Sequence, residues 1–205
     1  LIPEYLTAEA RKAILLEDER KSPVPFDKAK DEEDEQLALD NGLTLLVKNI
    51  ELRALDSDST ANAVLEAHRS LATDTSLRQH LLSGVNRGLS CAQAIIATAN
   101  HFCETFSRSS STYLQERVLD VRDVCYQLLQ HIYGEARFPS PGQLTQPSVC
   151  LADDLTPGQF LELDKTLLKG LLLKSGGTTS HTVILARSFN IPTLVGVDGE
   201  SLLQW

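Results

Sequence analysis

The residues that could do chemistry gather in one stretch, residues 176–187, which runs Gly-Gly-Thr-Thr-Ser-His-Thr-Val-Ile-Leu-Ala-Arg. The apolar run at residues 170–173 predicts a strand before it, and the residues after His181 predict a helix over 181–189. His181 would then stand at a helix start, where exposed backbone N–H groups and the helix dipole favour an anion. The same dipole disfavours the imidazolium, which leaves a neutral ring nitrogen free to attack phosphorus. This pattern suits a histidine that carries a phosphoryl group.

A histidine in a turn rich in glycine and threonine can also be purely structural, because short motifs predict function loosely. The neighbouring hydroxyl groups of Thr178, Thr179, Ser180 and Thr182 could orient the ring or donate to phosphoryl oxygens. Residue types alone therefore leave both interpretations of His181 open.

The elements that must position this stretch fall into zones. Residues 28–135 are predicted to be helical throughout. A capping box begins at Ser90 with Gln93, and apolar residues recur in steps of three and four over 114–132, as in a helix bundle. The acidic run at residues 31–35 predicts a solvated helix face.

The C-terminal zone has a different pattern. After the Pro- and Gly-rich linker at 138–142, short apolar runs alternate with helix signals, among them Thr156-Pro157-x-Gln159. We therefore expect an α+β chain of two subdomains. An all-α helical bundle over residues 28–137 would be inserted into a small α/β domain formed by residues 138–205 and the N-terminal segment 1–27, where residues 12–17 could add a strand.

Composition narrows the classes of function. The 205 residues are 42% hydrophobic, enough for a packed core, and the net charge of −9 argues against a nucleic acid partner and for a basic protein partner. No run of about 18 apolar residues occurs, so no membrane insertion is expected. The four cysteines lack CxxC spacing, and we expect reduced thiols in a cytoplasmic protein.

Residues 176–187 resemble the phosphohistidine signature of the phosphoenolpyruvate-utilising enzymes, Gly-Gly-x-Thr-Ser-His, a small residue, aliphatic residues and Ala-Arg. Residues 190–196, Asn-Ile-Pro-Thr-Leu-Val-Gly, resemble its continuation. Residues 113–123 resemble the last long helix of the helical subdomain of enzyme I of the bacterial sugar phosphotransferase system, and residues 152–157 match its Ala-x-Asp-Leu-Thr-Pro segment. The resemblance covers about residues 64–198 and is closest to the enzyme I modules of fused multiphosphoryl transfer proteins.

This resemblance implies a phosphoenolpyruvate-protein phosphotransferase, in which His181 carries the phosphoryl group and transfers it to a histidine of HPr in sugar uptake. It implies that four residues position the phosphoryl group: Gly177, Thr179, Ser180 and Arg187. It also implies that the helical subdomain docks HPr through a surface that includes His68, Leu71, Asp74, Leu77, Phe106 and Arg117. Thr178 stands where enzyme I usually has an arginine, so one positive charge near the phosphoryl group is missing.

The resemblance further implies a phosphoenolpyruvate-binding domain in the intact enzyme, which uses Mg²⁺. Within these residues we expect no cofactor and no metal ligand. Two alternatives remain: the swivelling domain of a pyruvate phosphate dikinase or phosphoenolpyruvate synthase, and a non-catalytic interaction module with a vestigial loop. The helical insertion argues against the first, and the intact Thr179-Ser180-His181 with Arg187 argues against the second. For Leu71 and Leu77 the alternative to a docking role is the bundle core, and for Arg117 it is an ion pair on the helix surface.

Overall fold

The structure, a computed structural model, describes residues 31–55, 59–134, 144–152, 155–174 and 180–197. The strand expected over residues 12–17 lies outside these ranges. The chain divides into two compact units, one of residues 23–139 and one of residues 1–22 with 140–205. The described part of the first is helical and that of the second is α/β, and each is described by itself.

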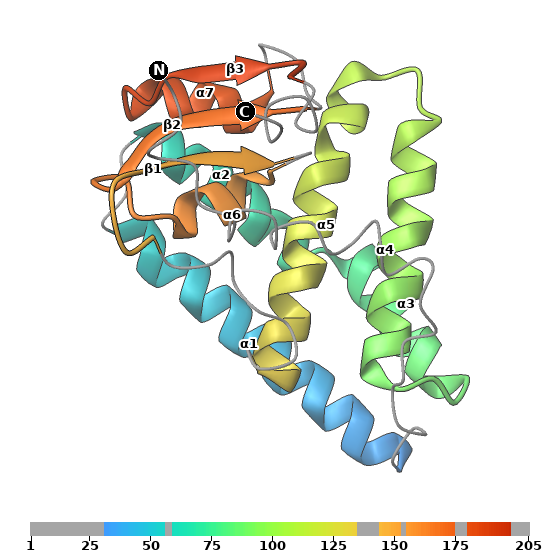
Figure 1. The fold of residues 1–205 in the computed structure, drawn as a ribbon. Coiled ribbons are helices and arrows are strands. Elements are labelled where there is room, and N and C mark those ends of the chain that lie inside the picture. Colours follow the sequence, from blue (N-terminus) through green and yellow to red (C-terminus); the bar gives the residue numbers. More distant parts are fainter. Residues whose placement is uncertain (1–30, 56–58, 135–143, 153–154, 175–179, 198–205) are drawn as a thin grey trace. The chain divides into compact units, whose positions relative to one another are not determined.

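The helical unit contains five helices in its described part: α1 (Glu32–Leu55), α2 (Ser59–Ala72), α3 (Thr75–Asn86), α4 (Cys91–Ser107) and α5 (Thr112–Tyr133) (Figure 1). Helix α5 packs against α1, α2 and α4, and α3 packs against α4. The core is aliphatic, with fully buried side chains that include Leu39, Leu46, Leu65, Leu81, Ile95 and Leu128. This is the helical bundle that the spacing of apolar residues predicts.

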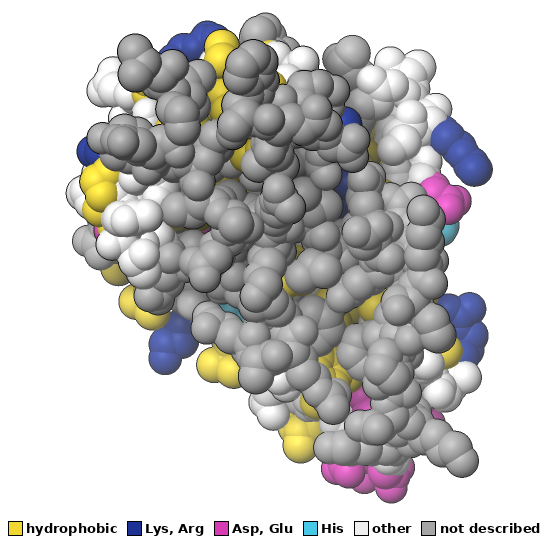
Figure 2. All heavy atoms as spheres, viewed as in Figure 1, with side chains coloured by type: hydrophobic (Ala, Val, Ile, Leu, Met, Phe, Trp, Pro, Cys, Tyr) yellow, Lys and Arg dark blue, Asp and Glu magenta, His cyan; other side chains and the backbone are white. Residues whose placement is uncertain are grey.

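Helix starts in this unit are fixed by side chains. The capping box predicted at Ser90 and Gln93 is present at the start of α4. Glu35 adds a cap from a distant part of the chain, because its carboxylate accepts a hydrogen bond from the Cys91 backbone N–H at 2.7 Å. Glu35 is therefore buried, although the other acidic residues of the first turn of α1 are exposed and gather at that end of the helix in Figure 2. The expectation of a solvated face was wrong for Glu35 alone among the described residues of the acidic run.

The α/β unit consists, in its described part, of β1 (Ser148–Ala152), α6 (Pro157–Glu162), β2 (Leu168–Leu173), α7 (His181–Ser188) and β3 (Thr193–Val195). The strands form a parallel sheet in the order β1-β2-β3, with Cys150 opposite Leu171 and Leu172 opposite Leu194. The capping box predicted at Thr156 and Gln159 starts α6. The α+β fold class is confirmed.

The four cysteines are free thiols, and three of them are buried. Burial raises the pKa of Cys125 to about 12 and that of Cys150 to about 11. Burial, with a hydrogen bond to Glu35, raises the pKa of Cys91 to about 12. These three thiols therefore stay protonated near neutral pH and are poor nucleophiles. No helix in the described ranges combines the length and apolar character needed to cross a membrane.

Candidate functional site

His181 is the first residue of α7, as the sequence pattern predicts, and its side chain is half-buried. Ser180 is the N-cap residue with an extended backbone, φ −63° and ψ 149°, and its hydroxyl oxygen accepts a hydrogen bond from the Val183 N–H at 3.4 Å. The imidazole thus lies at the positive end of the helix dipole with part of its surface open to a reactant.

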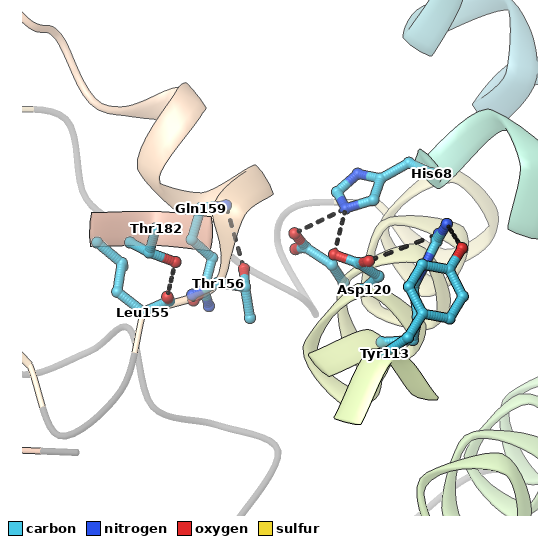
Figure 3. Close-up of polar contacts among 9 residues, drawn as sticks. His68, Tyr113, Asp120, Leu155, Thr156, Gln159 and Thr182 are labelled. Carbon is cyan, nitrogen blue, oxygen red and sulfur yellow. Dashed lines mark hydrogen bonds and ion pairs between the residues drawn. The ribbon is translucent and has the colours of Figure 1, made fainter. Parts of the chain in front are cut away.

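A buried hydrogen bond ties the start of α7 to the start of α6. The Thr182 hydroxyl donates to the Leu155 carbonyl oxygen at 2.6 Å, and Thr182 is buried. Leu155 directly precedes the Thr156–Gln159 capping box, so the contact joins two helix N-termini (Figure 3). The single hydroxyl proton of Thr182 is used in this contact, and the expectation that Thr182 could donate to a phosphoryl group is not supported.

We predict that Thr182→Val lowers the stability of the α/β unit. The substitution keeps the shape of the side chain but leaves the Leu155 carbonyl without this donor, which costs about 1–3 kcal/mol. Thermal unfolding and amide hydrogen exchange in α7 measure the loss. Thr193→Val is the matched control, because the Thr193 hydroxyl donates to the Ile191 carbonyl at 3.1 Å from a half-buried position. Equal exchange in α7 for the two variants would show that the Thr182 contact does not anchor the helix.

Of the remaining predicted phosphoryl-positioning residues, the structure describes Arg187, which does not lie beside His181. Arg187 is exposed in the last turn of α7. A separation of six residues places Arg187 about 9 Å along the helix axis from His181 and about 120° around it. Helix α7 therefore presents the two side chains on different faces. Gly177 and Thr179, and Thr178 between them, lie outside the described residues.

The residues predicted to dock HPr lie in the helical unit with very different exposure. Asp74 is exposed and caps α3, where its carboxylate accepts a hydrogen bond from the Leu77 N–H at 2.9 Å. Leu71 and Phe106 are half-buried. Leu77 is only 2% exposed and His68 is fully buried, so neither side chain offers surface to a partner. Leu77 belongs to the core, which is the alternative that its sequence position left open.

His68 instead belongs to a charged cluster between α2 and α5, formed by His68, Arg117, Asp120 and Asp123. The Nε2 atom of His68 lies 3.6 Å from Asp120 Oδ1 and 3.5 Å from Asp123 Oδ2. Asp120 Oδ2 lies 3.7 Å from Arg117 Nη1, and Arg117 also donates a hydrogen bond to the Tyr113 hydroxyl (Figure 3). The ion pair that the sequence offered as the alternative role of Arg117 is thus present, with Asp120 as its partner, but the Asp120 side chain is buried and the pair does not lie on the helix surface. Nothing in the sequence spacing indicated the approach of His68 to α5.

A second group of side chains is an aromatic cluster across α3 and α4, formed by His80, His101, Phe102 and Phe106. The rings of His80 and His101 stack with centroids 4.6 Å apart. Phe102 meets both histidine rings edge-on and meets Phe106 in the same way, with ring centroids 5.8 Å apart. Both histidines are exposed and both phenylalanines are half-buried, so the cluster presents aromatic rings at the surface.

Metal ligands do not gather in the part of the chain that the structure describes. No group of three or more His, Cys, Asp or Glu side chains there could hold a metal ion.

Two family models match the sequence. The N-terminal domain of PEP-utilising enzymes matches residues 7–117, which include most of the helical unit. The mobile domain of PEP-utilising enzymes matches residues 144–204, which include β1, β2, β3 and His181.

Similar proteins and a similar solved structure agree with these two family matches. The chain is 76% identical to multiphosphoryl transfer protein 2 of Escherichia coli K12 over 86% of its own length and 21% of that protein. It is 34% identical to the phosphoenolpyruvate-protein phosphotransferase of Staphylococcus carnosus, over 75% of this chain and 26% of that protein. The solution structure of an Enzyme I protein (nEIt) superimposes with a TM-score of 0.61 at 27% identity, covering 84% of this chain and 72% of that one. The chain thus spans between a fifth and about a quarter of these two curated relatives.

Proposed function

Because the chain belongs to the PEP-utilising enzymes, we propose that it is the phosphohistidine-carrying part of a phosphoenolpyruvate-protein phosphotransferase, with His181 as the phosphoryl carrier. One observation carries the proposal. His181 is the first residue of a capped helix inside the segment that matches the mobile domain, with its ring partly exposed. Buried Cys91, Cys125 and Cys150, with raised pKa values, are poor competitors as nucleophiles.

The transfer would proceed in two steps. A ring nitrogen of His181 attacks the phosphorus of phosphoenolpyruvate, so that an N–P bond forms, the O–P bond breaks and the enolate takes a proton to leave as pyruvate. A histidine nitrogen of HPr then attacks the same phosphorus and breaks the N–P bond. Catalysis in such transfers is mostly in-line positioning and stabilisation of charge. The positive end of the α7 dipole stabilises the added negative charge by about 0.3–1 kcal/mol.

Phosphoenolpyruvate and Mg²⁺ would bind elsewhere in an intact enzyme. The described residues hold no cluster suited to a metal ion. We assign the phosphoenolpyruvate and Mg²⁺ sites to parts of the relatives with which this chain does not align. A cytoplasmic location agrees with four free thiols.

We propose that HPr docks on the helical unit. The net charge of −9 favours a basic carrier surface, and the partly exposed aromatic cluster supplies ring contacts. Among the residues predicted for docking, those with accessible surface are Leu71, Asp74, Phe106 and Arg117. His68 and Leu77 would act from inside the unit.

We predict that Phe106→Ala weakens the binding of HPr about tenfold, because truncating an aromatic anchor costs about 1–3 kcal/mol. Isothermal titration measures the dissociation constant, and stopped-flow mixing at rising salt should show a falling association rate. Leu52→Ala on α1 is the matched control, since Leu52 is 56% exposed and lies outside the predicted surface. An unchanged dissociation constant for a folded Phe106→Ala protein would remove Phe106 from the docking surface.

A further inference from the structure

The carboxylate of Asp120 is buried without a hydrogen bond partner among the described residues. Asp120 is 1% exposed, and both of its oxygens lack such a partner there. Its nearest charged or ionisable neighbours in that part of the chain are His68 Nε2 at 3.6 Å and Arg117 Nη1 at 3.7 Å. A buried charge is costly unless an opposite charge compensates it. Water therefore cannot replace Arg117 as the partner of the buried Asp120 carboxylate, whereas it can replace either partner of the ion pairs on the surface of this unit.

Arg117 is held from its other side by an exposed ring. Its guanidinium donates to the Tyr113 hydroxyl, and its central carbon lies 5.0 Å from the centroid of the Tyr113 ring. Tyr113 is 59% exposed, and the Arg117 side chain is 19% exposed. A guanidinium has five N–H donors, so these two contacts leave donors for an oxyanion at the surface. In Figure 3, dashed lines run from His68 to Asp120, from Asp120 to the guanidinium and from the guanidinium to Tyr113.

His68 lies on the far side of Asp120, in contact with it at 3.6 Å, and neither ring nitrogen of His68 has a hydrogen bond partner among the described residues. Helix α2 places the His68 ring against Asp120 Oδ1, and Arg117 lies against the other oxygen, Oδ2. The same ring nitrogen lies 3.5 Å from Asp123 Oδ2, so it lies between two carboxylates of α5. Rotation of the Asp120 carboxylate would break its contact with His68 and its contact with Arg117 together.

We infer that His68 and Asp120 are positioning residues that orient Arg117 toward an oxyanion of the docked phosphocarrier, a carboxylate or a phosphoryl oxygen. This inference rests on the proposed function, because it assumes that the carrier docks on the helical unit. His68 would then affect the binding of the carrier without touching it, because it orients Asp120, which in turn orients Arg117.

The two buried aspartates provide a matched test. Asp120→Asn and Asp123→Asn make the same chemical change, at side chains 1% and 3% exposed, each within 3.6 Å of His68 Nε2. The Asp120 carboxylate is the one that lies 3.7 Å from Arg117 Nη1. We expect Asp120→Asn to weaken the binding of purified HPr about tenfold and Asp123→Asn to change it less than about twofold. Thermal unfolding of both variants confirms the folded state and reports any shared loss of stability.

A double-mutant cycle separates positioning from a general structural effect. In an Arg117→Gln background, Asp120→Asn and His68→Asn should each weaken HPr binding less than about twofold further, because the residue through which they act is gone. Equal losses for the two aspartate variants, or a full loss for Asp120→Asn in the Arg117→Gln background, would overturn the inference.

Phosphorylated and unphosphorylated HPr identify the oxyanion, and His181→Ala protein prevents transfer during the measurement. A loss on Arg117→Gln that is larger with phosphorylated HPr assigns the contact to the phosphoryl group, and an equal loss assigns it to a carboxylate of HPr. Either result supports the inference. Wild-type protein that binds neither form overturns the proposed function and this inference with it, whereas binding that is indifferent to Asp120 overturns the inference alone.

Discussion

We expect His181→Ala protein to take up no phosphoryl group from phosphorylated HPr, while the wild-type chain should approach one phosphoryl group per molecule. The reason is chemical, because alanine has no ring nitrogen to attack phosphorus and the buried thiols of Cys91, Cys125 and Cys150 stay protonated. The fold should survive, since His181 is half-buried at the first position of α7 and alanine is a good helix former. Radiolabelled phosphoryl transfer followed on a gel measures uptake, and circular dichroism checks the fold.

A second histidine provides the control for this variant. His131 on α5 is half-buried, and its Nδ1 atom lies 2.7 Å from the Gln127 carbonyl oxygen, so it resembles His181 in exposure but not in setting. His131→Ala should take up label like the wild-type chain. If His181→Ala protein is still labelled, or if His131→Ala abolishes labelling in a folded protein, the carrier has been misassigned.

We also expect a large difference between two phosphoryl donors in how well they label the chain. A polypeptide of these 205 residues should be labelled by phosphorylated HPr and not by phosphoenolpyruvate with Mg²⁺. Exchange between two histidines is close to thermoneutral, so the reverse reaction needs only the carrier histidine and a docking surface. The phosphoenolpyruvate reaction needs a further site. The chain spans 21% of multiphosphoryl transfer protein 2, and the described residues contain no cluster suited to a metal ion.

One gel with the two radiolabelled donors decides this prediction. Labelling by phosphoenolpyruvate alone would show that these residues contain a phosphoenolpyruvate site of their own. Labelling by neither donor, with HPr shown to be active on another acceptor, would favour the interaction module with a vestigial loop. Full-length multiphosphoryl transfer protein, which should accept both donors, is the positive control.

Local sequence signals predicted much of the fold. The capping boxes at Ser90 and Thr156 begin the helices that the sequence predicts, because a cap depends on residues three positions apart. The strand at residues 170–173 and the helix start at His181 are found for the same reason, since short-range pattern determines both. The position of His181 at a helix N-terminus, on which the proposed chemistry depends, was thus available from the sequence.

The sequence did not predict which polar side chains are buried between helices. His68 was predicted to lie on a docking surface, yet packing of α2 against α5 buries it beside Asp120 and Asp123, more than fifty residues away in the chain. Glu35 was expected in a solvated face, but it caps α4 at Cys91. A charged or polar side chain can be buried wherever a distant partner compensates it, and local spacing does not reveal that partner.

The position of the phosphoryl group on the chain tests the central claim most directly. The wild-type chain is labelled with phosphorylated HPr, digested at neutral to alkaline pH to preserve the acid-labile N–P bond, and mapped by tandem mass spectrometry. We expect the phosphoryl group on His181, in the peptide that includes residues 180–187, and its loss after brief acid treatment. A phosphoryl group on His68, His80, His101 or His131, or an acid-stable phosphate on a hydroxyl group, would contradict the assignment of His181 as the carrier.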